Sequence, residues 1–216
     1  MRSKLWLWLL VWSVPGRAVS APPLDAGIAA LAQRWDVIEY QTAKGEQAAA
    51  FAALAEQAHD LSAAQPGHAE PLIWEAIVLC SEAGAERGMG ALRLVKAARQ
   101  LLLQAEALDP KALDGSVYTS LGSLYYQVPG WPIGFGDKKQ AVIYLHKALE
   151  LNPDGIDPNY FYGDFLVEQG DYRAAVPVLE KALKAPPRPG REIADRGRRE
   201  EVRRTLQKAR DKGGRS

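Results

Sequence analysis

The side chains with the widest chemical range in this chain are three histidines and one cysteine. His59 and His68 flank the end of one predicted helix and the turn after it, and His146 stands in a later helix. A reactive thiol needs a neighbouring base, and no histidine is in local register with Cys80. The sequence contains no HExxH, CxxC or GxSxG pattern. We therefore predict a protein that is not an enzyme and that holds neither a metal nor a cofactor.

Residues 134–139, which read GFGDKK, have the glycine and lysine content of a phosphate-binding loop. The pattern GxxxxGK[ST] is absent, however, and no strand is predicted before the segment. No segment of the chain shows a sustained alternation of apolar and polar residues of the kind that a half-buried strand requires. We therefore expect neither a nucleotide nor a nucleic acid as partner.

The N-terminus has the organisation of a secretory signal peptide. Arg2 and Lys4 give it a positive start, residues 5–14 form an apolar run, and residues 18–20 are small enough for signal peptidase. The apolar run is short for a bilayer-spanning helix, and an uncleaved membrane anchor is the alternative. We expect a signal peptide over residues 1–20, cleavage after Ser20 and export to a bacterial periplasm.

Charged residues are distributed unevenly along the chain that follows the predicted signal peptide. Residues 21–187 contain 13 basic and 21 acidic side chains, whereas residues 188–216 contain 11 basic and 5 acidic ones. A solvated terminal helix would explain the basic segment. The alternative is a tail that contacts anionic lipid at a membrane surface or an acidic partner.

Residues 156–187 have the spacing of one complete helix–turn–helix repeat. Small residues such as Gly163 and Ala175 let two helices approach closely, and Leu166 and Leu179 fill the space between them. The spacing resembles that of the tetratricopeptide repeat, whose period is about 34 residues. The positions that carry the resemblance are Tyr162, Gly163, Leu166, Gly170, Tyr172, Ala175, Leu179, Ala182 and Pro187.

Three further helix pairs are predicted upstream, because Pro66, Pro110 and Pro153 end equivalent helices at similar intervals. The resemblance implies an all-α fold, a right-handed α–α solenoid of about four repeat-like helix pairs over residues 21–187. Residues 188–216 are predicted to form a basic C-terminal helix, from about residue 191 to 211, that caps the open end. The last four residues are expected to be disordered.

The first three units are longer than the family's repeat, and the surplus is predicted to form turns at residues 81–90 and 128–136. The second of these turns contains two prolines and three glycines, and Trp131, Ile133 and Phe135 alternate along it. These apolar side chains either fold back to fill a gap between helices or serve as a lid or anchor for a ligand or partner.

In the repeat family, fixed positions of each first helix face a concave groove. In this sequence those positions include Asp157, Tyr160, Asp164 and Glu168 in the last unit and Tyr126 in the unit before it. Carboxylates and tyrosines would favour a basic or polar peptide, or a small cationic ligand. The alternative is that the carboxylates only solvate the helix faces. The predicted binding residues are Tyr126, Trp131, Phe135, Asp157, Tyr160, Asp164 and Glu168.

The resemblance implies a non-catalytic scaffold that binds a protein or peptide partner through this groove. The chain also resembles, more weakly, the T component of TRAP transporters, which is a periplasmic repeat protein associated with a solute-binding protein. The shared features are the export signal, the long helical pairs and the Gly136-Asp137-Lys138 turn into a helix. That likeness implies the alternative of a small-ligand-binding accessory protein of a periplasmic transport system.

Overall fold

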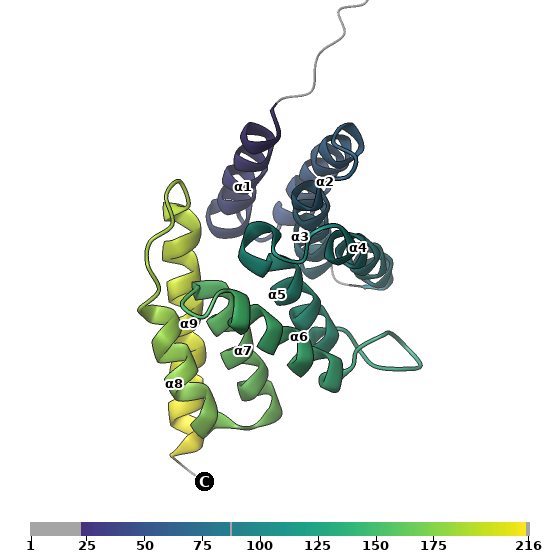
Figure 1. The fold of residues 1–216 in the computed structure, drawn as a ribbon. Helices are drawn as coiled ribbons and strands as arrows, with labels where there is room; N and C mark the ends of the chain where they lie inside the picture. Colours follow the sequence, from purple (N-terminus) through teal and green to yellow (C-terminus); the bar gives the residue numbers. More distant parts are fainter. Residues whose placement is uncertain (1–22, 87, 215–216) are drawn as a thin grey trace, which may run out of the picture.

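The computed structural model describes residues 23–86 and 88–214. The predicted signal peptide, residues 1–20, lies outside the described residues, as do the last two residues of the predicted disordered tail. The described chain is built from helices and turns (Figure 1). The helices are α1 (Leu24–Gln41), α2 (Gln47–Ala64), α3 (Ala69–Glu86), α4 (Met89–Leu108), α5 (Ala112–Gln127), α6 (Lys138–Leu151), α7 (Ile156–Gln169), α8 (Tyr172–Leu183) and α9 (Glu192–Gly213).

Consecutive helices pack in pairs, and the pairs stack on one another along the chain. The pairs are α1 with α2, α3 with α4, α5 with α6 and α7 with α8, and each first helix also contacts the first helix of the next pair. Helix α9 packs on α7 and α8, where the first helix of a further repeat would lie (Figure 1). Within the described ranges there is no strand, only an isolated bridge between Gly130 and Gly136. The predicted all-α solenoid is confirmed.

Small residues set the spacing inside the pairs, as the repeat pattern predicts. A Cβ atom on Gly163 would lie 2.5 Å from the side chain of Leu179, and one on Gly122 would lie 2.7 Å from that of Leu145. Leu145 and Leu179 are fully buried. In each of these pairs the leucine of the second helix therefore fills the space that a side chain on the first helix would need.

The predicted turn at residues 81–90 is wrong. Helix α3 continues to Glu86 and α4 begins at Met89, so the surplus residues lengthen both helices instead of forming a loop. The segment from residue 81 to 86 is rich in Ala and Glu, which are good helix formers, and the single Gly84 does not interrupt the helix. The predicted turn at residues 128–136 is present, and it joins α5 to α6.

Asp137 caps the helix that follows this turn. Its Oδ1 accepts hydrogen bonds from the backbone N–H groups of Lys139, at 2.8 Å, and Gln140, at 3.2 Å. The reciprocal half of a capping box is replaced by a tertiary contact, because the backbone N–H of Asp137 donates to the carbonyl of Tyr125, at 2.8 Å. The turn is thus tied to α5 where α6 begins.

Helix α5 begins with an unusual left-handed turn. Leu113, Asp114 and Gly115 have φ values of 50°, 55° and 75°. The left-handed region costs a residue other than glycine roughly 1–2 kcal/mol. The surrounding packing must offset this cost, and the turn aims Leu113 and Asp114 at the inner side of the solenoid.

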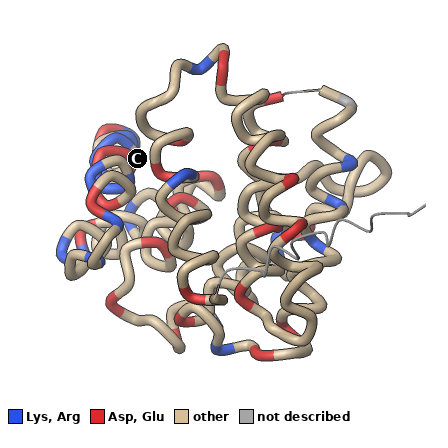
Figure 2. Tube along the Cα trace, turned by 90° about the horizontal axis from the view of Figure 1, so that it is seen from above, with Lys and Arg blue, Asp and Glu red and all other residues tan. Residues whose placement is uncertain are grey.

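The two ends of the array contact each other. Helix α9 touches α1 across the inner side, so the first and last helices close the solenoid on itself (Figure 1). Basic and acidic positions alternate near the C-terminus, and acidic positions are scattered over the rest of the fold (Figure 2). Among the described residues, no helix is both long and apolar enough to span a membrane.

Candidate functional site

The inner side of the solenoid encloses a cavity of about 450 Å³. The first helices of the four pairs, α1, α3, α5 and α7, contribute to its wall, and α9 closes the remaining side. The wall combines aromatic and aliphatic side chains with hydroxyl groups on α5. The apolar members are Trp35, Tyr40, Trp74, Ile77, Leu113 and Phe161, and the hydroxyl members on α5 are Ser116, Thr119, Ser120 and Ser123.

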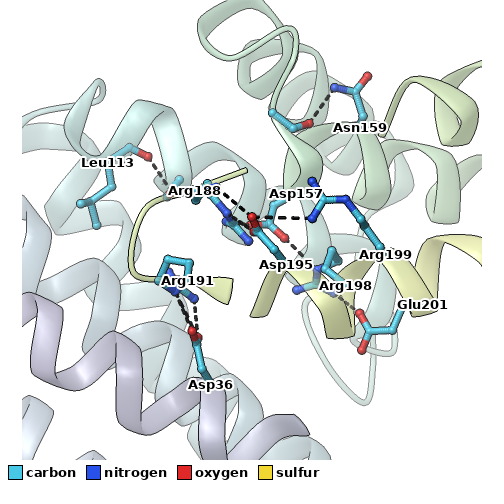
Figure 3. Close-up of polar contacts among 12 residues, drawn as sticks. Asp36, Leu113, Asp157, Asn159, Arg188, Arg191, Asp195, Arg198, Arg199 and Glu201 are labelled. Carbon is cyan, nitrogen blue, oxygen red and sulfur yellow. Dashed lines mark hydrogen bonds and ion pairs between the residues drawn. The ribbon is translucent and has the colours of Figure 1, made fainter. Parts of the chain in front are cut away.

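A buried ion pair closes the cavity between α1 and the start of α9. The Nη2 of Arg191 lies 2.7 Å from Oδ1 of Asp36, and its Nε lies 3.0 Å from Oδ2. Asp36 is only 2% exposed. Figure 3 shows this pair of Asp36 and Arg191. The same guanidinium lies 5.2 Å from the ring centre of Trp74, so it contacts a carboxylate and an aromatic face together. Nearby, the backbone of Gly197 packs directly against the ring of Tyr40.

A second ionic network closes the cavity between α7 and α9. Asp157 accepts from Arg188 Nη1 at 2.6 Å and from Arg198 Nε at 2.7 Å. Arg188 also donates to Asp195 at 2.7 Å, and Arg198 donates to Glu201 at 2.5 Å (Figure 3). Burial alone would raise the pKa of Asp157, but the two guanidinium groups outweigh it and lower that pKa to about 2. The network therefore stabilises the fold only while Asp157 is ionised.

Replacing Asp157 by asparagine should remove a pH-dependent part of the stability. The carboxyl has a pKa of 3.8 when unperturbed and about 2 in the fold. Because the folded pKa is the lower one, the stabilisation of about 2 kcal/mol is complete only above about pH 5 and is lost as the pH falls through 4 to below 2. Urea unfolding at pH 7, 4 and 2.5 should show a deficit of the variant that shrinks with each step into acid and is clearly smaller at pH 2.5 than at pH 7.

Asp154 provides the matched control for this titration. Its side chain is 77% exposed and pairs only with Lys181 in this structure, so Asp154→Asn should leave the pH profile unchanged. A constant difference between wild type and Asp157→Asn at all three pH values would contradict the assignment.

The structure brings all five predicted groove residues against α9 or against each other, Asp157 through the contact with Arg198 described above. Tyr160 lies under the guanidinium of Arg198, at 4.7 Å from its ring centre, and exposed Glu168 pairs with Lys208 at 3.1 Å. Asp164 accepts a hydrogen bond from the hydroxyl of Tyr126, at 2.7 Å. Burial raises the pKa values of both groups in that bond. The acidic face that the sequence offers to a basic partner thus faces the basic helix of the same chain.

The apolar side chains of the turn at residues 128–136 lie in two different environments. Phe135 packs edge-on against Tyr125, with 5.8 Å between ring centres, and the guanidinium of Arg99 lies 4.9 Å from the Phe135 ring. Trp131 is 90% exposed and Ile133 is 67% exposed. Phe135 therefore fills the space against the helices, as one alternative predicted, whereas Trp131 and Ile133 project into solvent as the other requires.

The described cysteine and histidines lie in separate places. Burial raises the pKa of the Cys80 thiol to about 12, which keeps it protonated. His59 contacts Glu75 at 3.0 Å, and His146 contacts the hydroxyl of Tyr162 at 3.1 Å. No group of three or more potential metal ligands occurs among the residues that the structure describes.

Sequence reasoning missed most of the cavity wall. Trp35, Trp74 and Asp36 were not among the predicted site residues, because their helices follow the repeat pattern only loosely. Arg191 and Arg198 belong to the C-terminal segment, which the sequence predicts as a cap on the end of the solenoid. The segment packs on α7 and α8 as such a cap would, and it also contributes to the cavity wall. The signal that could have found them is the charge pattern, since an acidic body and a basic terminal helix in one chain attract each other.

Comparison with known proteins supports the repeat architecture. The family model of the tetratricopeptide repeat matches residues 133–154 and 156–189. No curated protein sequence is significantly similar to the chain. A solved structure of MamA AMB-1 is similar with a TM-score of 0.45 and 20% sequence identity, over 85% of this chain and 99% of that one. The family match shows tetratricopeptide repeats over residues 133–154 and 156–189, which contain α6, α7 and α8 of the stacked helix pairs described above.

Proposed function

We propose that the protein is an exported, non-catalytic scaffold that binds a protein partner, with Trp131 and Ile133 as the anchor of the contact. Tetratricopeptide repeats generally act in protein–protein interaction. The observation that carries the assignment to this loop is the 90% exposure of Trp131 beside an Ile133 that is 67% exposed. Exposed apolar side chains grouped on one projecting turn are typical of a protein contact.

The turn is rigid enough to present these side chains without a large loss of entropy on binding. The backbone N–H of Gly136 donates to the carbonyl of Pro129 at 3.0 Å, and the N–H of Ile133 donates to that of Gly130 at 3.2 Å. Phe135 fixes the base of the turn on Tyr125. A preorganised anchor loses less conformational freedom when it is buried, which favours affinity.

The acidic inner face has a different role in this proposal from the one that the sequence predicted. Asp157, Tyr160 and Glu168 already contact cations of the C-terminal segment. A basic peptide would therefore have to displace α9, whose Val202 and Leu206 are buried in the core. Many cations of α9 are likewise engaged, such as Arg210 with Glu180, and this reduces the charge available to a membrane surface. The exposed turn at residues 128–136 is therefore more accessible to a protein partner than the acidic inner face.

Export to the periplasm is part of the proposal and is supported by the sequence alone. Basic residues, a short apolar run and small residues at 18–20 occur in the order that signal peptidase substrates require. The lone Cys80 suits an oxidising compartment, because its half-buried, protonated thiol is a poor nucleophile. Fractionation of cells that produce the full chain, with mass determination of its N-terminus, tests this part.

A crosslinking experiment tests the docking site. A photo-crosslinking amino acid at position 133 should capture one protein in periplasm, and the purified partner should then bind the wild-type chain reversibly. Trp131→Ala should weaken that binding at least about tenfold, because buried tryptophans are among the strongest interface residues. The melting temperature should be unchanged, since the Trp131 side chain is exposed.

Leu108→Ala is the matched control, because Leu108 is an apolar side chain that is 49% exposed at the end of α4. It should leave the affinity for the captured partner unchanged. Equal binding by Trp131→Ala and wild type would rule out the loop as the anchor.

A further inference from the structure

We propose that the inner cavity between α1, α3, α5, α7 and α9 binds a small organic cation, an amine with a flat apolar part. This site is separate from the turn at residues 128–136 and does not depend on the proposed scaffold function. The size, the charge balance, the aromatic wall and the backbone conformation of the cavity each point to such a ligand.

The cavity has the size and enclosure of a small-molecule site. Its volume of about 450 Å³ falls within the range of roughly 300–1,000 Å³ that is typical of ligand pockets. Protein interiors are close-packed, and voids much larger than a water molecule are few. A partly enclosed space of this size, walled by five helices and bordered by two ionic networks, is therefore a notable feature of the fold.

The charge balance of the wall favours a cation. Each of its three guanidinium groups, on Arg188, Arg191 and Arg198, already contacts at least one carboxylate. Two wall carboxylates, those of Glu39 and Asp114, make no direct hydrogen bond or ion pair with the described residues. Excess negative charge at an enclosed surface attracts a cation and repels an anion.

Glu39 is the carboxylate best placed to receive the cation. It is half-buried, and burial raises the pKa of its carboxyl by more than the nearby Lys44 lowers it. The cations nearest to it are engaged elsewhere: Lys44 donates to Gln47 at 3.2 Å, and Arg198 is bound to Asp157. A bound ammonium would supply the missing partner.

The aromatic wall offers surface beside Glu39 that no cation of the described chain covers. Guanidinium groups already lie on Trp74, at 5.2 Å, and on Phe161, at 4.9 Å from the ring centre. Trp35 and Tyr40 contact each other edge-on, 5.8 Å between ring centres, and no described cation lies over either ring. Both rings line the cavity on the helix that carries Glu39, and the part of the half-buried Tyr40 ring that Gly197 leaves uncovered can pack against the flat part of a ligand while the ligand's charge meets the carboxylate.

Serine hydroxyls on α5 supply acceptors for the N–H groups of an ammonium. Ser116 donates its own hydrogen to the carbonyl of Leu113 at 2.7 Å, and Ser123 donates to that of Ser120 at 3.0 Å. Their oxygens therefore line the cavity as acceptors. An N–H donor suits these groups better than a carboxylate would.

The left-handed turn at the start of α5 lies at the same cavity. Leu113 and Asp114 both line it in a conformation that L-residues rarely adopt. Such conformations persist where the surrounding structure enforces them, and they cluster at ligand sites. Here the turn places the carboxylate of Asp114, which is exposed to solvent, at the cavity.

Two matched probes test the proposal in calorimetric titrations of the purified full chain at pH 7. Phenethylamine, an ammonium ion at this pH, should bind with a Kd of about 1 mM or lower, which is reasonable for so small a ligand. Its anionic counterpart, 3-phenylpropionate, should bind at least about tenfold more weakly.

Substitutions at the unpaired carboxylates then locate the site. Glu39→Gln should weaken phenethylamine binding at least about tenfold. Adding Asp114→Asn to this variant should weaken the binding further, and asparagine tolerates the left-handed conformation at position 114. Glu56→Gln, on the exposed face of α2, is the control and should bind like the wild type. The melting temperature of Glu39→Gln should be unchanged, because Glu39 has no direct partner to lose.

Three results would each overturn the proposal. They are equal or tighter binding of 3-phenylpropionate, an affinity of Glu39→Gln within about twofold of the wild type, and no saturable binding of phenethylamine up to about 10 mM.

Discussion

Asp36→Asn should lower the free energy of unfolding by about 3 kcal/mol, one of the largest effects expected from a single substitution in this chain. Asp36 is 2% exposed and accepts three hydrogen-bond contacts from Arg191. Removing one partner of a buried ion pair leaves the other charge without compensation, which typically costs about 3–5 kcal/mol. Denaturant unfolding at pH 7 measures the loss.

The same variant should separate the two ends of the solenoid. Spin labels on cysteines introduced at Gln33 and Arg204, both exposed, report the distance between α1 and α9. Cys80 should not be labelled, because burial raises the pKa of its thiol to about 12. The distance distribution of Asp36→Asn should be longer and broader than that of the wild type.

A double variant separates the loss of charge from the loss of packing. Asp36→Leu combined with Arg191→Met removes both charges and keeps apolar bulk, so it should recover most of the lost stability. If Asp36→Asn cost less than about 1 kcal/mol, the ion pair would not be what holds α1 to α9.

Gly163→Ala should destabilise the fold by about 1–3 kcal/mol, because the new Cβ would lie 2.5 Å from the side chain of Leu179. Leu179→Ala should cost about 2–5 kcal/mol, since Leu179 is fully buried. The double variant should cost clearly less than the two together, because the alanine at 179 leaves room for the one at 163. Denaturant unfolding of the four proteins completes the cycle.

Gly84→Ala is the control for this cycle. A Cβ atom at Gly84 has nothing within 4 Å, and the residue lies inside α3. Alanine there should stabilise the protein by about 0.5–1 kcal/mol through helix propensity. Strict additivity of Gly163→Ala and Leu179→Ala would show that the two positions do not share the space between α7 and α8.

The sequence predicted those features of the fold that depend on local spacing. The spacing of the repeat positions from Tyr162 to Pro187 predicted α7 and α8, because the small and large residues at these positions pack against each other within one repeat. Helix lengths in the second pair were missed, because an Ala-rich extension of a helix and an inserted turn look alike without knowledge of the neighbouring packing.

The site could be predicted only in part, since its closure depends on residues far apart in the chain. Of the predicted binding residues, Asp157 is the one that lines the cavity, and it occupies a fixed repeat position. The groups that turn this face into a cavity come from opposite ends of the sequence: Asp36 and Arg191 are 155 residues apart. The left-handed turn at Leu113 was also beyond prediction, because neither Leu113 nor Asp114 favours that conformation strongly enough to indicate it.

The contact between α1 and α9 also limits how this array can come apart. An open repeat array is nearly one-dimensional: it can lose terminal units singly and gain units without disturbing the others. Here each terminal unit is the other's neighbour, so neither can leave without exposing the second. Loss of the unit at one end therefore removes contacts from the helix at the other end as well, which does not happen in an open array.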